Sequence, residues 1–96
     1  MVEYRLSNTA KEDLIRIHQY GTHTFGQLQA DKYVNTFFDY FEIIAKRPFA
    51  FESVDYIKPG YRRCVCGVDS IFYRIENDIV EIMSIVGRQD INQIFK

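Results

Sequence analysis

The sequence predicts an α+β fold in which an antiparallel pair of helices packs on one face of an antiparallel sheet. Apolar residues recur at helical spacing through the first half of the chain and at strand spacing through the second half. Pro48 and the Pro59-Gly60 pair lie between the two halves and interrupt both patterns. The expected element order is β-α-α-β-β-β, followed by a short C-terminal helical turn.

Composition limits the class of protein. The 96 residues suit a single domain, 1–96, and 47% apolar with 16% aromatic residues excludes a disordered chain. A net charge of −1 argues against a nucleic-acid coat protein, and we expect no sequence-specific nucleic-acid binding. No apolar run approaches the ~20 residues that span a bilayer, and no signal-peptide apolar region follows Met1. We therefore expect a soluble, cytoplasmic protein without membrane association.

The first strand and the first helix follow from local patterns. Residues 2–6 alternate apolar and polar side chains, which is typical of a half-buried strand. Residues 7–9 offer capping oxygens, and Thr9 with Glu12 matches a capping box. The helix that follows is expected to end near Gly21. Its apolar stripe comprises Ala10, Leu14 and Ile17.

The second helix is the most apolar element of the chain. It is expected to begin after the turn at Phe25-Gly26 and to end before Pro48, because proline cannot continue the hydrogen-bond ladder. Its stripe comprises Ala30, Val34, Phe37, Phe41 and Ile44. A short link containing glycine predicts that the two helices form an antiparallel hairpin. A stripe so rich in Phe needs a cover, and the strands are the available one.

Three strands are predicted in the second half, over residues 61–66, 71–76 and 79–86. A tight turn at Gly67-Val68 joins the first two, and Asn77-Asp78 tolerates the positive φ that the second hairpin requires. The last strand is apolar on both faces, which predicts an interior position in the sheet. One face is expected to carry Val80, Ile82 and Val86, and the other Ile79, Met83 and Ile85. In the tail, Ile91, Ile94 and Phe95 have the spacing of a short helical turn.

Two cysteines, Cys64 and Cys66, are expected on one face of a single strand. Residues at this spacing are too far apart for an easy disulfide bond. His18 and His23 fall on a different segment, so a zinc site is not expected, and no other metal or cofactor is indicated. The two thiols are therefore interpreted as small, half-buried side chains in a reducing compartment.

Arginines are concentrated around the predicted strands. The four candidates for a partner-binding surface are Arg62, Arg63, Arg74 and Arg88. Strand interiors rarely carry so many guanidinium groups unless one sheet face meets solvent or an acidic partner. The alternative is a solvated face with a structural ion pair, for example to Glu76 or Glu81. Neighbours on a strand point in opposite directions, so only one of Arg62 and Arg63 shares a face with Arg74.

Motifs along nearly the whole chain resemble the RelE/ParE superfamily of bacterial type II toxins, and ParE more closely than RelE. The matching segments are Tyr4-Arg5-Leu6-Ser7 with Ala10, Asp13-Leu14 and Ile17; Phe25-Gly26 with Gln29-Ala30 and Tyr33; Arg47-Pro48; Gly60-Tyr61-Arg62-Arg63 with Gly67; Ile71-Phe72-Tyr73-Arg74; and Arg88-Gln89-Asp90. Their order and spacing together are specific. The chain departs from the family pattern where a His usually precedes the Ile-Phe-Tyr run, at Asp69 or Ser70, and around Arg88.

The resemblance implies a toxin that a ParD-like antitoxin holds inactive in a hetero-oligomer. ParE members poison DNA gyrase, whereas RelE members cut mRNA in the ribosomal A site. Cleavage of RNA requires acid and base groups near the scissile phosphate, but no His follows His23 and no Tyr follows Tyr73. Arginine is a poor proton shuttle because its pKa stays above ~12. ParE-like inhibition of gyrase without catalytic residues is thus the preferred reading.

Two alternatives stay open at this point. One is a RelE-like, metal-independent mRNA interferase, and the other is a toxin-fold relative that binds only the antitoxin. ParD-like partners fold an amphipathic segment onto the toxin, by helix-in-groove or strand-addition modes. If part of the second helix is exposed, Phe38 and Tyr40 are the expected anchors for such a segment.

Overall fold

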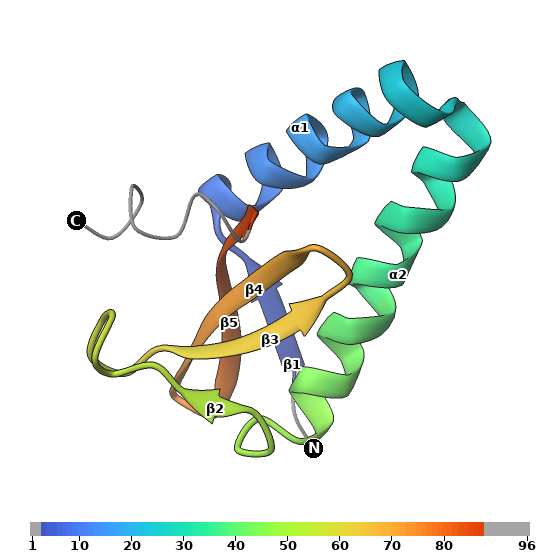
Figure 1. Ribbon diagram of the computed structural model, residues 1–96. Coiled ribbons are helices and arrows are strands. Elements are labelled where there is room, and N and C mark those ends of the chain that lie inside the picture. The colour runs from blue at the N-terminus through green and yellow to red at the C-terminus, as the bar shows by residue number, and fades with distance from the viewer. Residues whose placement is uncertain (1–2, 88–96) are drawn as a thin grey trace.

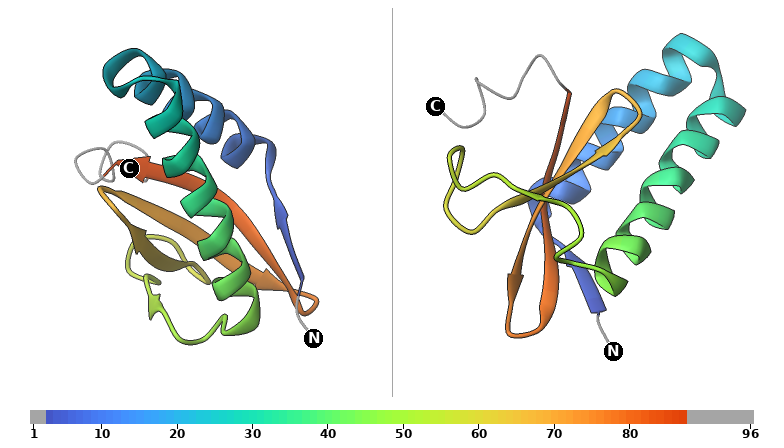
Figure 2. Two further views of the ribbon diagram at one scale, coloured as in Figure 1. Left: turned by 90° about the vertical axis from the view of Figure 1, so that its right-hand side faces the viewer. Right: turned by 60° about the horizontal axis from the view of Figure 1, so that its bottom comes forward.

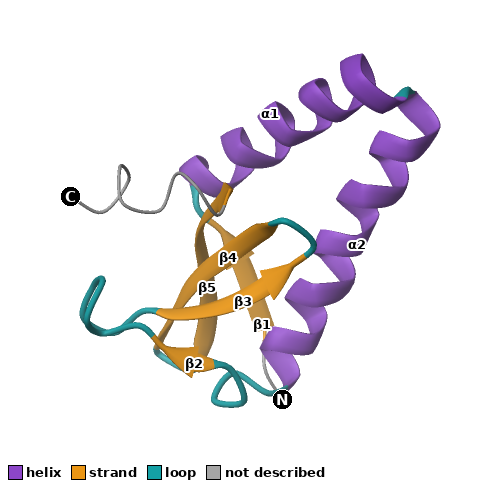
Figure 3. Cartoon of the chain, viewed as in Figure 1, coloured by secondary structure: helices purple, strands orange, loops and turns teal. Residues whose placement is uncertain are grey.

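The computed structural model describes residues 3–87, which form two helices and a five-stranded sheet (Figures 1 and 3). The elements are β1 (Glu3–Leu6), α1 (Asn8–Phe25), α2 (Gln27–Lys46), β2 (Glu52–Ser53), β3 (Arg62–Cys66), β4 (Asp69–Glu76) and β5 (Ile79–Gly87). The predicted α+β class and the order of the main elements are confirmed. The predicted C-terminal helical turn and Arg88 lie outside the described residues.

The sheet is mixed, not purely antiparallel as predicted. Its strand order is β1-β5-β4-β3-β2, and β1 runs parallel to β5 while the other pairs are antiparallel. A parallel pair needs a long crossover, and here both helices and the remaining strands supply it. The two-residue β2 at the other edge was not predicted, because so short a segment has no periodicity to detect. The interior position of β5 is confirmed.

Helix α1 begins and ends at positions other than those predicted. Its N-cap is Ser7, whose hydroxyl oxygen accepts a hydrogen bond from the amide of Ala10 at 3.0 Å, so the expected Thr9 capping box does not form. The helix continues past Gly21 to Phe25. A Cβ atom on Gly21 would lie 3.2 Å from the Cβ of Ala30, so this glycine allows α2 to approach closely instead of ending α1.

The two helices diverge from Gly26 as the arms of a V, and both cover the same face of the sheet (Figures 1 and 2). Gly26 adopts φ of 93°, which glycine tolerates without strain. Helix α2 ends at Lys46, before Pro48, as predicted. The buried core between helices and sheet includes Leu14, Ile17, Phe37, Phe41, Ile44, Cys64, Cys66, Ile71, Tyr73, Val80, Ile82 and Ile85.

A β-bulge on β5 changes which residues reach this core. Tyr73 pairs with Ile82 whereas Phe72 pairs with Ser84, which leaves Met83 as the extra residue. The alternation therefore shifts by one position beyond Ile82. Val80, Ile82 and Ile85 face the helices, and Val86 faces the opposite side. The prediction that Val86 shares a face with Val80 and Ile82 was wrong for this reason.

The outer face of the sheet, opposite the helices, carries a second small core. Val54, Tyr61, Phe72 and Val86 form this buried cluster, with Ile57 and Met83 packed against it. The loop between β2 and β3 covers it, and the amide of Val54 donates to the carbonyl of Tyr61 at 2.8 Å to close that loop. Both faces of the sheet are thus buried at least in part, which explains the apolar character of β5 on both sides.

Ser7 and two side chains of α1 complete the edge of β5 where β1 ends. The amide of Ser7 donates to the carbonyl of Ile82 at 3.0 Å, and the Ser7 hydroxyl donates to the carbonyl of Met83 at 2.8 Å. Further along, Asp13 accepts from the amide of Ile85 at 2.9 Å and Arg16 donates to its carbonyl at 3.2 Å. These bonds satisfy backbone groups that β1 is too short to reach. No helix within residues 3–87 is long and apolar enough to cross a membrane.

Candidate functional site

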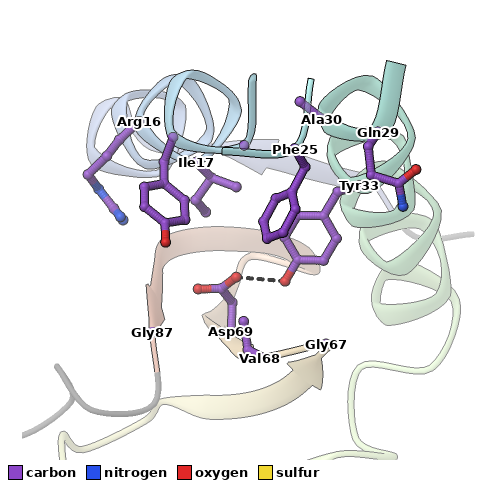
Figure 4. Close-up of a pocket in the computed structure, with 12 residues that line it drawn as sticks. Arg16, Ile17, Phe25, Gln29, Ala30, Tyr33, Gly67, Val68, Asp69 and Gly87 are labelled. Atoms are coloured by element: carbon purple, nitrogen blue, oxygen red, sulfur yellow. Dashed lines mark hydrogen bonds between the residues drawn. The ribbon is translucent and has the colours of Figure 1, made fainter. Parts of the chain in front are cut away.

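A groove of about 650 Å³ lies between the arms of the V and the turn that joins β3 to β4. Three parts of the chain line it (Figure 4). Helix α1 contributes Arg16, Ile17, Tyr20, Gly21 and Phe25, and helix α2 contributes Gln29, Ala30 and Tyr33. The β3–β4 turn contributes Gly67 and Val68, and strands β4 and β5 contribute Asp69 and Gly87. We call this cavity the helix–hairpin groove. Most of its lining is apolar, which is typical of a site that receives an apolar or amphipathic partner.

Tyr33 and Asp69 form a hydrogen bond in the groove, with the Tyr33 hydroxyl donating to Asp69 Oδ2 at 2.7 Å (Figure 4). Burial first, and this bond second, raise the pKa of Tyr33 above its usual value. Tyr33 therefore stays protonated and remains a donor at physiological pH. The hydroxyl also lies 3.3 Å from the carbonyl oxygen of Cys66, and the ring packs edge-on against Phe37.

Gly67 allows this arrangement. It adopts φ of 61°, and a Cβ atom at this position would lie 2.8 Å from the Tyr33 hydroxyl oxygen. The predicted tight turn at Gly67-Val68 is confirmed, with Cys66 paired to Asp69 across it. Cross-strand partners share a face, so Asp69 is brought to the same side of the sheet as Cys66, toward the helices.

Large apolar side chains are exposed around the groove. Tyr20 is 67% exposed, Phe25 68% and Val68 73%. Leu28, close to Phe25 at the start of α2, is 73% exposed. A cluster of this kind next to a cavity marks an interaction surface more often than scattered single residues do.

The predicted arginines do not form one surface. Arg62 pairs with Tyr73 and so lies on the helix side of the sheet, where its guanidinium donates to the carbonyl of Phe51 at 2.7 Å. It also lies 5.0 Å from the ring centroid of Phe49. These contacts tie the segment after α2 to β3. Arg62 is therefore separated by the sheet from Arg63 and Arg74.

Arg63 and Arg74 lie on the outer face, where glutamates hold both. Arg63 donates to Glu52 Oε1 at 2.9 and 2.6 Å. Arg74 contacts Glu81 at 2.8 Å and Glu76 at 3.0 Å, and the hydrogen bond to Glu81 is the main cause that raises the pKa of Arg74. The sequence predicted Glu76 and Glu81 as possible partners in a structural ion pair, and Arg74 contacts both of them. The role of the arginines in partner binding stays a prediction, and Arg88 lies outside the described residues.

The predicted aromatic anchors belong to α2 but do not line the groove. Phe38 is 37% exposed and packs edge-on against Phe41, and Tyr40 is partly buried against the helix-side core. Their proposed contact with a partner also stays a prediction.

Sequence reasoning missed the Tyr33–Asp69 pair and the groove around it. One signal was present: a two-residue hairpin that pairs Cys66 with Asp69 puts an acidic side chain on the face that carries the core. Acidic residues are rarely buried without a partner, so this position already marks an unusual site. The contact of Tyr33 with Asp69 depends on packing between segments that are distant in the sequence.

The prediction that the two cysteines share one face of a strand without a disulfide bond is confirmed, but both are fully buried and not half-buried as predicted. Cys64 and Cys66 are buried in the helix-side core and form no disulfide bond. Burial raises the pKa of each thiol to about 11, so both are protonated at physiological pH. Among residues 3–87 no cluster of His, Cys, Asp or Glu could hold a metal ion.

Comparison with known proteins gives the family. Residues 4–92 match the family described as ParE toxin of the type II toxin–antitoxin system, parDE. This chain belongs to the ParE toxin family. A relative named Toxin ParE1, from Caulobacter vibrioides, is 37% identical over 75 residues, which are 78% of each chain. The resemblance inferred from the sequence motifs is therefore confirmed.

Solved structures support the ParE fold. A chain of the chromosomal ParDE system from P. aeruginosa superposes with a TM-score of 0.81 at 18% identity, over 91% of this chain and 96% of that one. A chain of the RelBE2 toxin–antitoxin complex from Mycobacterium tuberculosis gives 0.70 at 15% identity, over 91% and 98%. At these identities the likeness establishes the fold of the ParE chain and not its target.

Proposed function

We propose that this ParE-family toxin acts in the cytoplasm by forming complexes: it inhibits DNA gyrase, and a ParD-like antitoxin neutralises it in a hetero-oligomer. The observation that carries the proposal is the family match over residues 4–92, together with a relative named as a ParE toxin. The structural neighbour from the ParDE system of P. aeruginosa supports the same kind of partnership.

The geometry of the described residues favours binding over catalysis. The guanidinium groups of Arg63 and Arg74 are engaged by glutamates, and His18 sits on α1 beside Asp31 at 2.6 Å. Burial raises the pKa of Tyr73 to about 12, and its hydroxyl donates to the carbonyl of Pro48 at 2.6 Å. General acid–base catalysis needs groups whose pKa lies near the working pH, beside the cations that hold the substrate. Residues 3–87 do not bring such a set together.

The helix–hairpin groove supports the antitoxin part of the proposal. An amphipathic segment inserts its apolar face into a groove of this kind, and the exposed Tyr20, Phe25 and Val68 supply apolar area on both sides. Arg63 and Arg74 are each already paired with glutamates and so offer a partner less free charge.

The test is a supercoiling assay with purified DNA gyrase, in which the toxin is titrated and both inhibition and linearised plasmid are scored. We expect inhibition with trapped cleavage complexes, reversed by an equimolar amount of the antitoxin encoded beside the toxin gene. No effect at micromolar toxin would overturn the gyrase target. Cleavage of mRNA on ribosomes would then identify a RelE-like interferase, and antitoxin binding without either activity would identify a toxin-fold relative that only binds antitoxin.

A further inference from the structure

Asp69 is an acidic side chain in a groove whose lining is mainly apolar. It is the first residue of β4, and its pairing with Cys66 turns its side chain toward the helices. The residue is 9% exposed, in a chain where most charged groups lie on the surface. A carboxylate in such a place loses much of its hydration and needs a compensating partner.

One of its two oxygens is compensated within the chain. Oδ2 accepts the hydrogen bond from Tyr33, which is a neutral donor. Within residues 3–87, Oδ1 accepts no hydrogen bond and no salt bridge reaches Asp69. Every buried side-chain oxygen of this region has a hydrogen-bond partner. Oδ1 has none, so it is not buried and faces the open groove. The negative charge of Asp69 is therefore not neutralised by the described residues.

The basic residue that lines the groove is committed elsewhere. Arg16 lies 3.4 Å from Asp13 and donates to the carbonyl of Ile85 at 3.2 Å, and through these bonds it completes the edge of β5. To reach Asp69 it would have to leave that carbonyl without a donor. No basic residue among residues 3–87 thus neutralises Asp69, and its charge is open to a group that enters the groove from outside.

We propose that Asp69 is a specificity-determining residue that receives a Lys or Arg side chain from an amphipathic segment of the antitoxin. The apolar residues that flank this basic residue in the segment cover Tyr20, Phe25 and Val68. The proposal rests on the proposed function, because it names the chemistry by which the antitoxin is chosen. Docking of an apolar segment removes the remaining water from Oδ1, and a cation restores the lost interaction whereas a neutral or acidic residue does not.

Discrimination follows from the same desolvation. An antitoxin with an apolar or acidic residue at this place would bury an unpaired carboxylate. The resulting loss of affinity in the mismatched complex exceeds the gain that the ion pair gives to the matched complex. Tyr33 is a positioning residue in this scheme: its hydroxyl holds Oδ2 and turns Oδ1 toward the groove. It makes no contact with the incoming cation itself.

The experiment compares the affinity of wild-type toxin and of Asp69→Asn for the antitoxin encoded beside the toxin gene, by titration calorimetry at low and high salt. Asparagine keeps an oxygen for Tyr33 and removes the charge. We expect affinity to fall by about 10- to 100-fold at low salt, with a weaker salt dependence in the variant. The matched control is Glu52→Gln on the outer face, which removes a carboxylate that already has its own arginine and should leave affinity within twofold.

A second measurement does not depend on the folding of a toxin variant. Each Lys and Arg of the antitoxin is replaced in turn by Met, and binding to wild-type toxin is measured. One replacement should lower affinity as much as Asp69→Asn does, and the two changes together should cost no more than either alone. Tyr33→Phe should give a smaller loss and keep the salt dependence, because it removes the positioning bond and not the charge.

The outcomes separate the two proposals. If wild-type toxin does not bind the antitoxin at micromolar concentration, the proposed function fails and this inference fails with it. If wild-type toxin binds and Asp69→Asn binds equally well, or no basic residue of the antitoxin couples to Asp69, the inference is overturned while the proposed function stands.

Discussion

The two ends of β4 carry charged residues in opposite circumstances. At its end, Arg74 pairs with Glu76 and with Glu81 of the neighbouring strand, so the outer face neutralises its own charge. At its start, Asp69 meets, among residues 3–87, a single neutral donor and an apolar groove. The comparison teaches that the number of charges on a surface is a poor guide to partner binding. What counts is which charge the fold has left without an opposite charge.

The two faces of the sheet also differ in what covers them. Two long helices bury the inner face, while the outer face has a loop and a cluster of four buried residues, Val54, Tyr61, Phe72 and Val86. The central phenylalanines of the two clusters are nevertheless equally buried: Phe37 on the inner face and Phe72 on the outer face are both fully buried. Substitutions on the two faces can show whether the loop-covered face is a true core and whether its charges are structural.

The largest expected effect comes from truncating Phe72. Phe72→Ala should lower the free energy of unfolding by about 3–5 kcal/mol, as much as Phe37→Ala on the helix side, because each leaves a cavity in close-packed surroundings. Urea unfolding followed by circular dichroism measures both variants. A loss below about 1 kcal/mol for Phe72→Ala alone would mean that the loop closes over the gap and that the two faces are not equivalent.

A smaller loss is expected at the junction of α1 with the sheet. Ser7→Ala removes the cap on the amide of Ala10 and the donor to the carbonyl of Met83, and should cost about 1–2 kcal/mol. Thr9→Ala is the matched control, since the sequence pattern favoured Thr9 as the cap and the structure assigns that role to Ser7. Equal losses for the two variants in urea unfolding would contradict this assignment.

The buried thiols of Cys64 and Cys66 should lower the free energy of unfolding at alkaline pH. Burial raises the pKa of Cys64 and Cys66 to about 11 from an ordinary value of 9.0, so between these values the folded chain holds protons that the unfolded chain releases. Unfolding then becomes easier as pH rises from about 9 to about 11. The double variant Cys64→Ala, Cys66→Ala should show a shallower decline in urea unfolding measured across this range.

Part of that decline should persist in the double variant, because burial also raises the pKa of Tyr73 to about 12. A decline identical to that of the wild type would indicate that the thiols are already exposed in the folded chain. Their modification by iodoacetamide at pH 8, compared with and without urea, checks the same point independently.

The smallest effect is expected on the outer face. Glu52→Gln should change the free energy of unfolding by no more than about 0.5 kcal/mol, because the Arg63–Glu52 pair is partly exposed and an ion pair at the surface contributes little. Thermal unfolding at two salt concentrations measures it. A loss above about 1 kcal/mol would show that this pair holds the β2 edge in place and that the outer charges contribute more than surface pairs usually do.

Much of the fold was readable from the sequence because its signals are local. The Phe-rich stripe of α2 faces the core, Pro48 follows the helix end, and the turns at Gly67-Val68 and Asn77-Asp78 form as predicted, the latter with φ of 53° and 65°. Each of these depends on residues within a few positions of one another. The family resemblance had the same basis, since its motifs lie in order along the chain.

The remaining features depend on contacts between segments far apart in the sequence. Packing of these segments decides whether Gly21 ends α1 or lets Ala30 approach closely. It also decides whether Met83 forms a bulge and whether β1 runs parallel to β5. The groove has the same origin: a tyrosine from α2 meets an aspartate from the β3–β4 hairpin because the V of the helices and the turn leave a cavity between them. Local periodicity therefore determined the main elements and the inward faces of the helices. Tertiary packing decided which residues of β5 face inward beyond the bulge, and which charges found partners.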